Sequence, residues 1–154
     1  MPYSTKQSRR IVILGVPIDD ITEDEVIERI TTWIADGGPH QICTVNPEFV
    51  MAARRVPAFR RVLLHADLNT PDGFGLILEA RRRGTPFRAR VTGVGLTERI
   101  AAEAARRGWR LFLLGAAPGV AEQAAAALES GWAWRWEAAL PGEVWQWLHS
   151  LPDQ

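Results

Sequence analysis

The chain has 154 residues, a length typical of one domain around a single core. Its 18 basic residues balance 18 acidic ones, which argues against a dedicated nucleic-acid binder, since such proteins are normally basic. No apolar run is long enough to span a membrane, and the segment Met1–Arg10 lacks the apolar stretch of a signal peptide. A single cysteine, Cys43, excludes a multi-cysteine zinc site. A cytoplasmic protein is expected.

The first part of the chain alternates between short apolar runs and amphipathic stretches. Thr22 and Glu25 have the spacing of a capping box, which predicts a helix that ends at Gly37-Gly38-Pro39. Asn46-Pro47 predicts the start of another helix, with Asn46 as cap. The predicted elements are a strand at 11–14 stopped by Gly15, a strand at 41–45, and helices at 47–54 and 57–65.

The alternation continues in the second part. Residues 109–114 form the most apolar, strand-like run of the chain, followed by a glycine turn and an alanine-rich helix. Strands that alternate with helices predict an α/β fold with a largely parallel sheet flanked by helices. The remaining predicted elements are an extended segment at 68–71, a helix after Asp72-Gly73 that ends at Arg81–Gly84, an extended segment at 90–92, and helices at about 96–107 and 120–128.

Ligands of open α/β sheets bind beyond the carboxyl ends of the strands, and the segment Thr44–Glu48 falls at such an end. Asn46 is explained equally well as a helix cap, and Thr44 as an ordinary strand residue. The functional alternative is that Thr44 and Asn46 hydrogen-bond a polar ligand, helped by the free amides of the helix start.

A second candidate segment is Pro71–Gly75. Asp72 has two interpretations, a helix N-cap after a proline turn or a general base at the mouth of a pocket. Gly73 lacks a side chain and would let a ligand approach the backbone closely.

The third candidate segment is the turn Gly115–Gly119, whose amides could hold a phosphate, although such a turn more often only connects a strand to a helix. It lacks the dinucleotide-binding glycine fingerprint and the P-loop lysine. The three histidines and the carboxylates show no metal-ligand spacing, so no metal site is predicted.

Taken together and in order, four segments resemble the TagA/WecG/CpsF glycosyltransferases, glycosyltransferase family 26. The matching segments are Thr44-Val45-Asn46-Pro47-Glu48, Asp67-Leu68-Asn69-Thr70-Pro71-Asp72-Gly73-Phe74-Gly75, Arg90-Val91-Thr92-Gly93 and Phe112-Leu113-Leu114-Gly115-Ala116-Ala117-Pro118-Gly119-Val120-Ala121. Each motif alone is weak evidence for a family, whereas four motifs in the same order and spacing are fairly specific for this one. The similarity runs from about Ile11 to Leu128.

The resemblance implies transfer of an N-acetylhexosamine, of the N-acetylmannosamine type, from a UDP-sugar. The implied acceptor is a sugar on a polyprenyl diphosphate, in the synthesis of bacterial surface polysaccharide or teichoic acid at the cytoplasmic membrane face. The implied transfer inverts the sugar, needs no metal or other cofactor, and takes place on a Rossmann-like sheet. Membrane contact and a homo-oligomer are left open.

The resemblance also implies roles for individual residues. Asp72 is the base that deprotonates the acceptor hydroxyl, and Arg90 neutralises phosphate charge. The substrate-pocket residues are Thr44, Asn46 and Gly73, and the turn beside the nucleotide is formed by Gly115 and Gly119. These roles agree with the chemistry, since sugar transfer needs a base at the attacking hydroxyl and amides or positive charge at the departing UDP.

Two departures from the family pattern concern Gly95 and the end of the chain. The family often has an acidic or polar residue at position 95, and its members continue into a glutamine motif and a basic appendage that this sequence lacks. We therefore expect a shortened glycosyltransferase core at 1–130 and an atypical tail at 131–154.

A catalytically impaired remnant or a sugar-nucleotide-binding module is the alternative function. An unrelated nucleotide-binding Rossmann domain is a third, disfavoured by the absent glycine fingerprint.

The tail is rich in tryptophan. It contains Trp132, Trp134, Trp136, Trp145 and Trp147. Residues 144–148 have the spacing of a short amphipathic helix, which could pack on the sheet or meet a membrane surface. The preferred hypothesis is a frameshift near codons 129–131, because TGG codons arise readily when GC-rich sequence is misread. A glutamine motif in another frame of the downstream DNA would support it.

Overall fold

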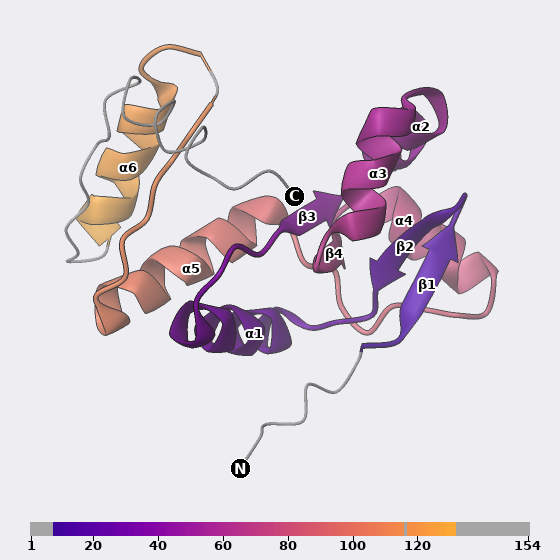
Figure 1. Ribbon diagram of the computed structural model, residues 1–154, viewed down its shortest axis with the longest axis horizontal. Helices are drawn as coiled ribbons and strands as arrows, with labels where there is room; N and C mark the ends of the chain where they lie inside the picture. Colours follow the sequence, from indigo (N-terminus) through magenta and orange to yellow (C-terminus); the bar gives the residue numbers. More distant parts are fainter. Residues whose placement is uncertain (1–7, 116, 132–154) are drawn as a thin grey trace. The chain divides into compact units, whose positions relative to one another are not determined.

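The computed structural model describes residues 8–115 and 117–131, and the chain divides into two compact units, Met1–Thr97 and Glu98–Gln154 (Figure 1). The first unit contains β1 (Arg10–Ile13), β2 (Val16–Asp19), α1 (Glu23–Asp36), β3 (Ile42–Val45), α2 (Pro47–Arg55), α3 (Pro57–His65), β4 (Leu68–Pro71), α4 (Phe74–Arg82) and the beginning of α5 (Gly93–Arg107). The second unit contains the rest of α5 and α6 (Val120–Gly131). The predicted tail helix at 144–148 lies outside the described residues.

The apolar run at residues 11–14 belongs to a β-hairpin. β1 pairs antiparallel with β2, with Arg10 opposite Asp19 and Ile13 opposite Val16. Leu14 and Gly15 form the turn with φ of 49° and 84°, the left-handed values that a tight hairpin turn requires. The sequence predicts that Gly15 stops the strand, and the structure shows that the chain also returns as a second strand.

Helix α1 begins and ends where the sequence predicts. The Thr22 hydroxyl accepts a hydrogen bond from the Glu25 backbone N–H at 3.4 Å, and the Glu25 carboxylate accepts one from the Thr22 N–H at 2.8 Å. The expected capping box is therefore confirmed. The helix ends at Gly37, whose φ of 78° suits glycine.

Strands β3 and β4 form the parallel pair that the alternating pattern predicts, with Ile42 opposite Leu68 and Val45 opposite Pro71. The connection between them consists of α2 and α3, so this part is a β–α–β unit with two helices in the crossover. The predicted bounds of α3 and β4 are confirmed to the residue, and α2 extends one residue beyond its prediction.

The inner polar contacts of the first unit centre on β4. Asn69 is fully buried, and its side-chain amide donates to the carbonyls of Pro17 at 2.9 Å and Leu63 at 2.7 Å. Its backbone N–H donates to the buried carboxylate of Asp19 at 2.9 Å. These bonds join β4 to the hairpin and to the end of α3, beside an apolar core shared by β1, β2, β3, α2, α3 and α4.

The described residues form a mixed α/β structure with two separate two-stranded sheets, one antiparallel and one parallel. The described residues therefore do not form the single, largely parallel sheet that the sequence predicts. The prediction of a strand at 109–114 is wrong, since the described residues include no strand there and Leu114 is 72% exposed. An apolar run becomes a strand only where a neighbour pairs with its backbone groups.

Across the described ranges, no helix is both long enough and apolar enough to cross a membrane.

Candidate active site

The carboxyl ends of β3 and β4 bring the first two candidate segments together. Because the strands are parallel and in register, Thr44, the penultimate residue of β3, and Asn46, directly after β3, lie near Asp72 and Gly73, which follow β4. The backbone N–H of Asp72 donates to the carbonyl of Val45 at 2.9 Å, which extends the pairing past the end of β4. All four candidate residues are half-buried, so their polar groups line one partly open edge of the parallel pair.

The carboxylate of Asp72 is held by the start of another helix. Its Oδ2 accepts a hydrogen bond at 3.0 Å from the backbone N–H of Gly93, the first residue of α5. The N-cap of α4 is Gly73, and no side chain caps that helix, so the interpretation of Asp72 as the α4 cap is wrong. Asp72 instead connects the end of β4 to the start of α5.

Asn46 is the N-cap of α2, because its Oδ1 accepts a hydrogen bond at 2.8 Å from the N–H of Phe49. The capping interpretation is therefore confirmed for this residue, and it leaves the side-chain NH₂ group as a donor. Neither that NH₂ group nor the Thr44 hydroxyl hydrogen-bonds another protein group within residues 8–115 and 117–131. Both groups can serve a ligand at the strand ends.

Gly73 packs against the start of α2. A Cβ at this position would collide with Cδ of Pro47 and lie 3.1 Å from Cα of Asn46. The absence of a side chain therefore lets the starts of α2 and α4 meet, whatever role Gly73 has toward a substrate.

Replacing Gly73 with alanine should lower the free energy of unfolding by about 1–3 kcal/mol, because the added methyl group overpacks this contact. Urea denaturation measures the change. The double variant Gly73→Ala with Pro47→Ala removes the opposing ring atoms and should lose less stability than the sum of the single variants. Strict additivity would contradict the packing argument.

The motif Arg90-Val91-Thr92-Gly93 is joined to this edge by backbone hydrogen bonds, which place Arg90 next to it. The N–H of Val91 donates to the carbonyl of Pro71 at 3.0 Å, and the Thr70 hydroxyl donates to the Val91 carbonyl at 3.4 Å. Arg90 itself is exposed and forms no ion pair within the described ranges. Its charge is thus available to an anion from outside the chain.

Arg88 anchors the same segment on its other side. Its guanidinium contacts the Glu25 carboxylate at 2.6 Å, and its backbone N–H donates to the buried carboxylate of Asp20 at 2.7 Å. The hydrogen bond from Arg88 lowers the pKa of Glu25 from 4.5 to about 2, with a further contribution from the Thr22 N–H. The segment that carries Arg90 and Gly93 is therefore tied to the start of α1.

This ion pair predicts a loss of stability in acid. Glu25 has a lower pKa in the folded state than in the unfolded chain, so its contribution is complete above about pH 4.5 and disappears as the pH falls toward 2. The Glu25 side chain is 41% exposed, so we expect only roughly 0.5 kcal/mol. Glu25→Gln keeps a capping-box residue and should lose this amount at pH 7 but nothing near pH 2.

Denaturation of wild type and Glu25→Gln across this pH range measures the difference. Glu28→Gln, an equal change at an exposed position of the same helix, is the control and should show no such difference. A Glu25→Gln effect that does not depend on pH would contradict the ion-pair assignment.

Gly115 and Gly119 belong to the second unit. Their φ values of 110° and 84° are left-handed, so both positions favour glycine for reasons of backbone conformation alone. The turn leads into α6, where the N–H of Gln123 donates to the Gly119 carbonyl at 3.2 Å. Their predicted role beside a nucleotide stays a prediction.

Gly93 is a site residue that the sequence does not predict. The predicted helix begins at about 96, whereas α5 begins at Gly93, and the Thr92 hydroxyl accepts a hydrogen bond from the Gly95 N–H at 3.1 Å. Thr92 was the available signal, because threonine is a common N-cap residue.

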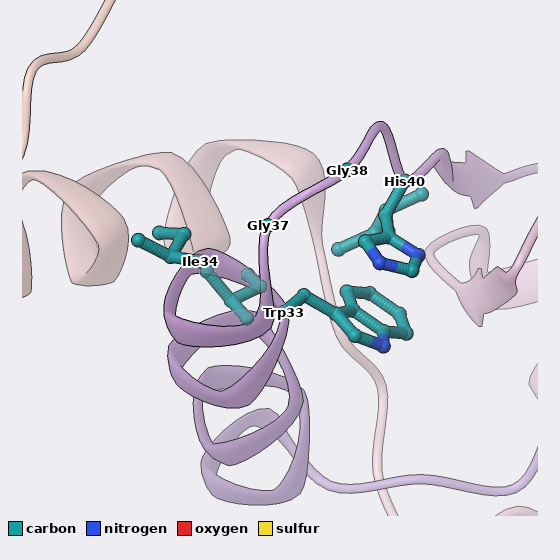
Figure 2. Close-up of a pocket in the computed structure, with 7 residues that line it drawn as sticks. Trp33, Ile34, Gly37, Gly38 and His40 are labelled. Atoms are coloured by element: carbon teal, nitrogen blue, oxygen red, sulfur yellow. The ribbon is translucent and has the colours of Figure 1, made fainter.

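A hollow of about 450 Å³ lies elsewhere, at the amino end of β3 (Figure 2). Trp33 and His40 stack there with ring centroids 4.5 Å apart, and His40 Nδ1 is 3.2 Å from the Asp67 carboxylate. The polar cluster of Thr44, Asn46 and Asp72 is at the opposite end of the strands. Among the described residues, no three or more His, Cys, Asp or Glu side chains are placed to hold a metal ion.

Comparison with known proteins identifies the family of this chain. The family model described as "Glycosyl transferase WecG/TagA/CpsF family" matches residues 11–136, most of the chain. The chain therefore belongs to this family, as its four motifs predict.

Curated relatives come from Staphylococcus aureus strains, including NCTC 8325 / PS 47, COL and MRSA252. Each is named N-acetylglucosaminyldiphosphoundecaprenol N-acetyl-beta-D-mannosaminyltransferase and is 31% identical over 122 residues. The match covers 78% of this chain and 48% of each relative, so the chain spans about half the length of these proteins.

Proposed function

We propose that this chain forms the acceptor-activating part of a glycosyltransferase. The reaction moves an N-acetylmannosamine-type sugar from a UDP-sugar to a sugar on a polyprenyl diphosphate, in bacterial cell-surface polymer synthesis at the inner membrane face. The observation that carries the proposal is the position of the Asp72 carboxylate, which lies at the carboxyl end of β4 beside Thr44 and is held on one oxygen by Gly93. The names of the relatives support the substrate classes.

In the proposed reaction, Asp72 Oδ1 accepts the proton of the attacking hydroxyl, because Oδ2 is already hydrogen-bonded to Gly93. The hydroxyl oxygen forms a bond to the anomeric carbon as the bond from that carbon to the UDP oxygen breaks. UDP leaves with the electron pair, and the configuration inverts. The free charge of Arg90 would stabilise the departing diphosphate.

We also propose that β3 and β4 belong to a Rossmann-like sheet in proteins of the relatives' full length. Their parallel register and helical crossover support this arrangement.

The alternative is a sugar-nucleotide-binding module or remnant without turnover. It is favoured by the Thr44 hydroxyl and the NH₂ group of Asn46, which can bind a polar ligand without any chemical step. Turnover of a UDP-N-acetylhexosamine by this chain separates the two functions.

Calorimetry tests the donor class. We expect weak binding of UDP and UDP-N-acetylhexosamine, with Thr44 and Asn46 contributing, and no loss of binding in EDTA. NAD serves as the comparison ligand, since the sequence lacks the dinucleotide fingerprint. Tighter binding of NAD, or a strict magnesium requirement, would contradict the proposal.

A further inference from the structure

The first residue of α5 lies between the two polar side chains at the strand ends. A Cβ at Gly93 would stand 3.2 Å from the Thr44 hydroxyl oxygen and 3.6 Å from both the Thr44 methyl carbon and Asp72 Oδ2. A side chain at this position would therefore project into the space that separates Thr44 from Asp72. The hydrogen bond from the Gly93 N–H to Asp72 places the start of α5 at the carboxyl end of β4.

The backbone does not require glycine at this position. Seven glycines of the described residues have positive φ, and Gly93 is not among them. Glycine is also a poor helix former, so alanine would suit the helix better. The glycine is explained by the space it leaves between Thr44 and Asp72.

The backbone N–H of Gly93 has a second effect, because it fixes the direction of the carboxylate. With Oδ2 bonded to this N–H, the other oxygen, Oδ1, is left for an incoming hydroxyl. The Thr44 hydroxyl has no protein partner in the described part of the chain and can bind the same ligand.

We propose that Gly93 is a positioning and specificity-determining residue, whose N–H orients Asp72 and whose missing side chain leaves room for a hydroxyl group of the acceptor sugar between Asp72 and Thr44. The inference rests on the proposed function and adds to it the place where the acceptor enters. It predicts that a side chain at position 93 would weaken acceptor binding by filling this space, and that the Gly93 N–H orients the Asp72 carboxylate through one hydrogen bond.

The hydrogen bond is tested without any substrate. Hydrogen exchange followed by NMR on this chain should show the Gly93 amide protected in wild type. In Asp72→Ala its exchange should be about tenfold faster or more, whereas Asp72→Asn, which keeps a carbonyl acceptor, should retain most of the protection. Equal exchange in wild type and Asp72→Ala would overturn the positioning role.

The role of the missing side chain at Gly93 is tested by titration with N-acetylglucosamine on a short prenyl diphosphate. This probe should shift the amide resonances of Thr44, Asp72 and Gly93 in wild type. Gly93→Ala should weaken binding about tenfold or more, as an extra methyl group does in a fitted pocket, without lowering the thermal midpoint. Gly93→Ser, whose side chain fills more of the same space, should weaken binding at least as much as Gly93→Ala does.

The matched control is Val94→Ala, on the same helical turn, because Val94 is 75% exposed. It should bind the probe as wild type does. Normal binding by Gly93→Ala, or no shift in wild type, would overturn the inference. The proposed function fails separately, if wild type binds the probe as expected but transfer does not depend on Asp72.

Discussion

Replacing Asp72 with asparagine should lower the rate of sugar transfer by about 100-fold or more, the usual size of a general-base effect, and leave the fold intact. The asparagine carbonyl can still accept the 3.0 Å hydrogen bond from the Gly93 N–H, so the connection between β4 and α5 is kept. The amide group cannot take the proton of the acceptor hydroxyl, so only the chemical step is lost.

Transfer is measured with UDP-N-acetylmannosamine and a prenyl-diphosphate acceptor, in this chain and in one extended to the relatives' full length. Asp67→Asn is a matched control, because it makes the same chemical change at the other end of β4. There Asp67 accepts a hydrogen bond from the Gln41 N–H at 2.8 Å, which asparagine can also accept. Unchanged transfer by Asp72→Asn in an active chain would exclude Asp72 as the base.

Replacing Asn69 with alanine should lower the free energy of unfolding by about 2–4 kcal/mol, the largest loss of stability that we expect from a single change. Asn69 is 0% exposed, and its amide supplies the hydrogen bonds to the Pro17 and Leu63 carbonyls. Alanine would leave both carbonyls without this donor, and each unpaired buried group costs about 1–3 kcal/mol.

Asn46→Ala provides the comparison, because it also removes an asparagine side chain next to the parallel pair. Asn46 makes one capping hydrogen bond to Phe49, and the loss of such a cap costs about 1 kcal/mol. Urea denaturation of both variants tests the difference. A loss for Asn69→Ala no larger than that for Asn46→Ala would show that the buried amide is not the link between β4 and its neighbours.

Local sequence signals predicted the elements of the first unit except β2. The Thr22–Glu25 capping box, the Asn46-Pro47 helix start and the run at 68–71 each depend on contacts within a few residues, and the structure confirms them. The same signals gave the strand assignment at 109–114, which is wrong in the described structure, because its apolar pattern says nothing about a pairing partner.

The sequence predicted only part of the candidate site. The carboxyl ends of parallel strands meet at one edge, so the sequence could place Thr44, Asn46 and Asp72 together once β3 and β4 were predicted. It could not distinguish a cap from a base at Asp72, since both use a carboxylate at a helix start. The bond to Gly93, 21 residues away, decides against the cap.

By itself, the sequence determined the family, the mixed α/β class and the residues gathered at the strand ends, because these depend on motif order and local periodicity. Only the tertiary structure decided that Gly15 turns a hairpin, that Asn69 links β4 to β2 and α3, and that Gly93 holds Asp72. These contacts join segments that are far apart in the chain or depend on a pairing partner. Their energy comes from backbone groups whose partners no local pattern specifies.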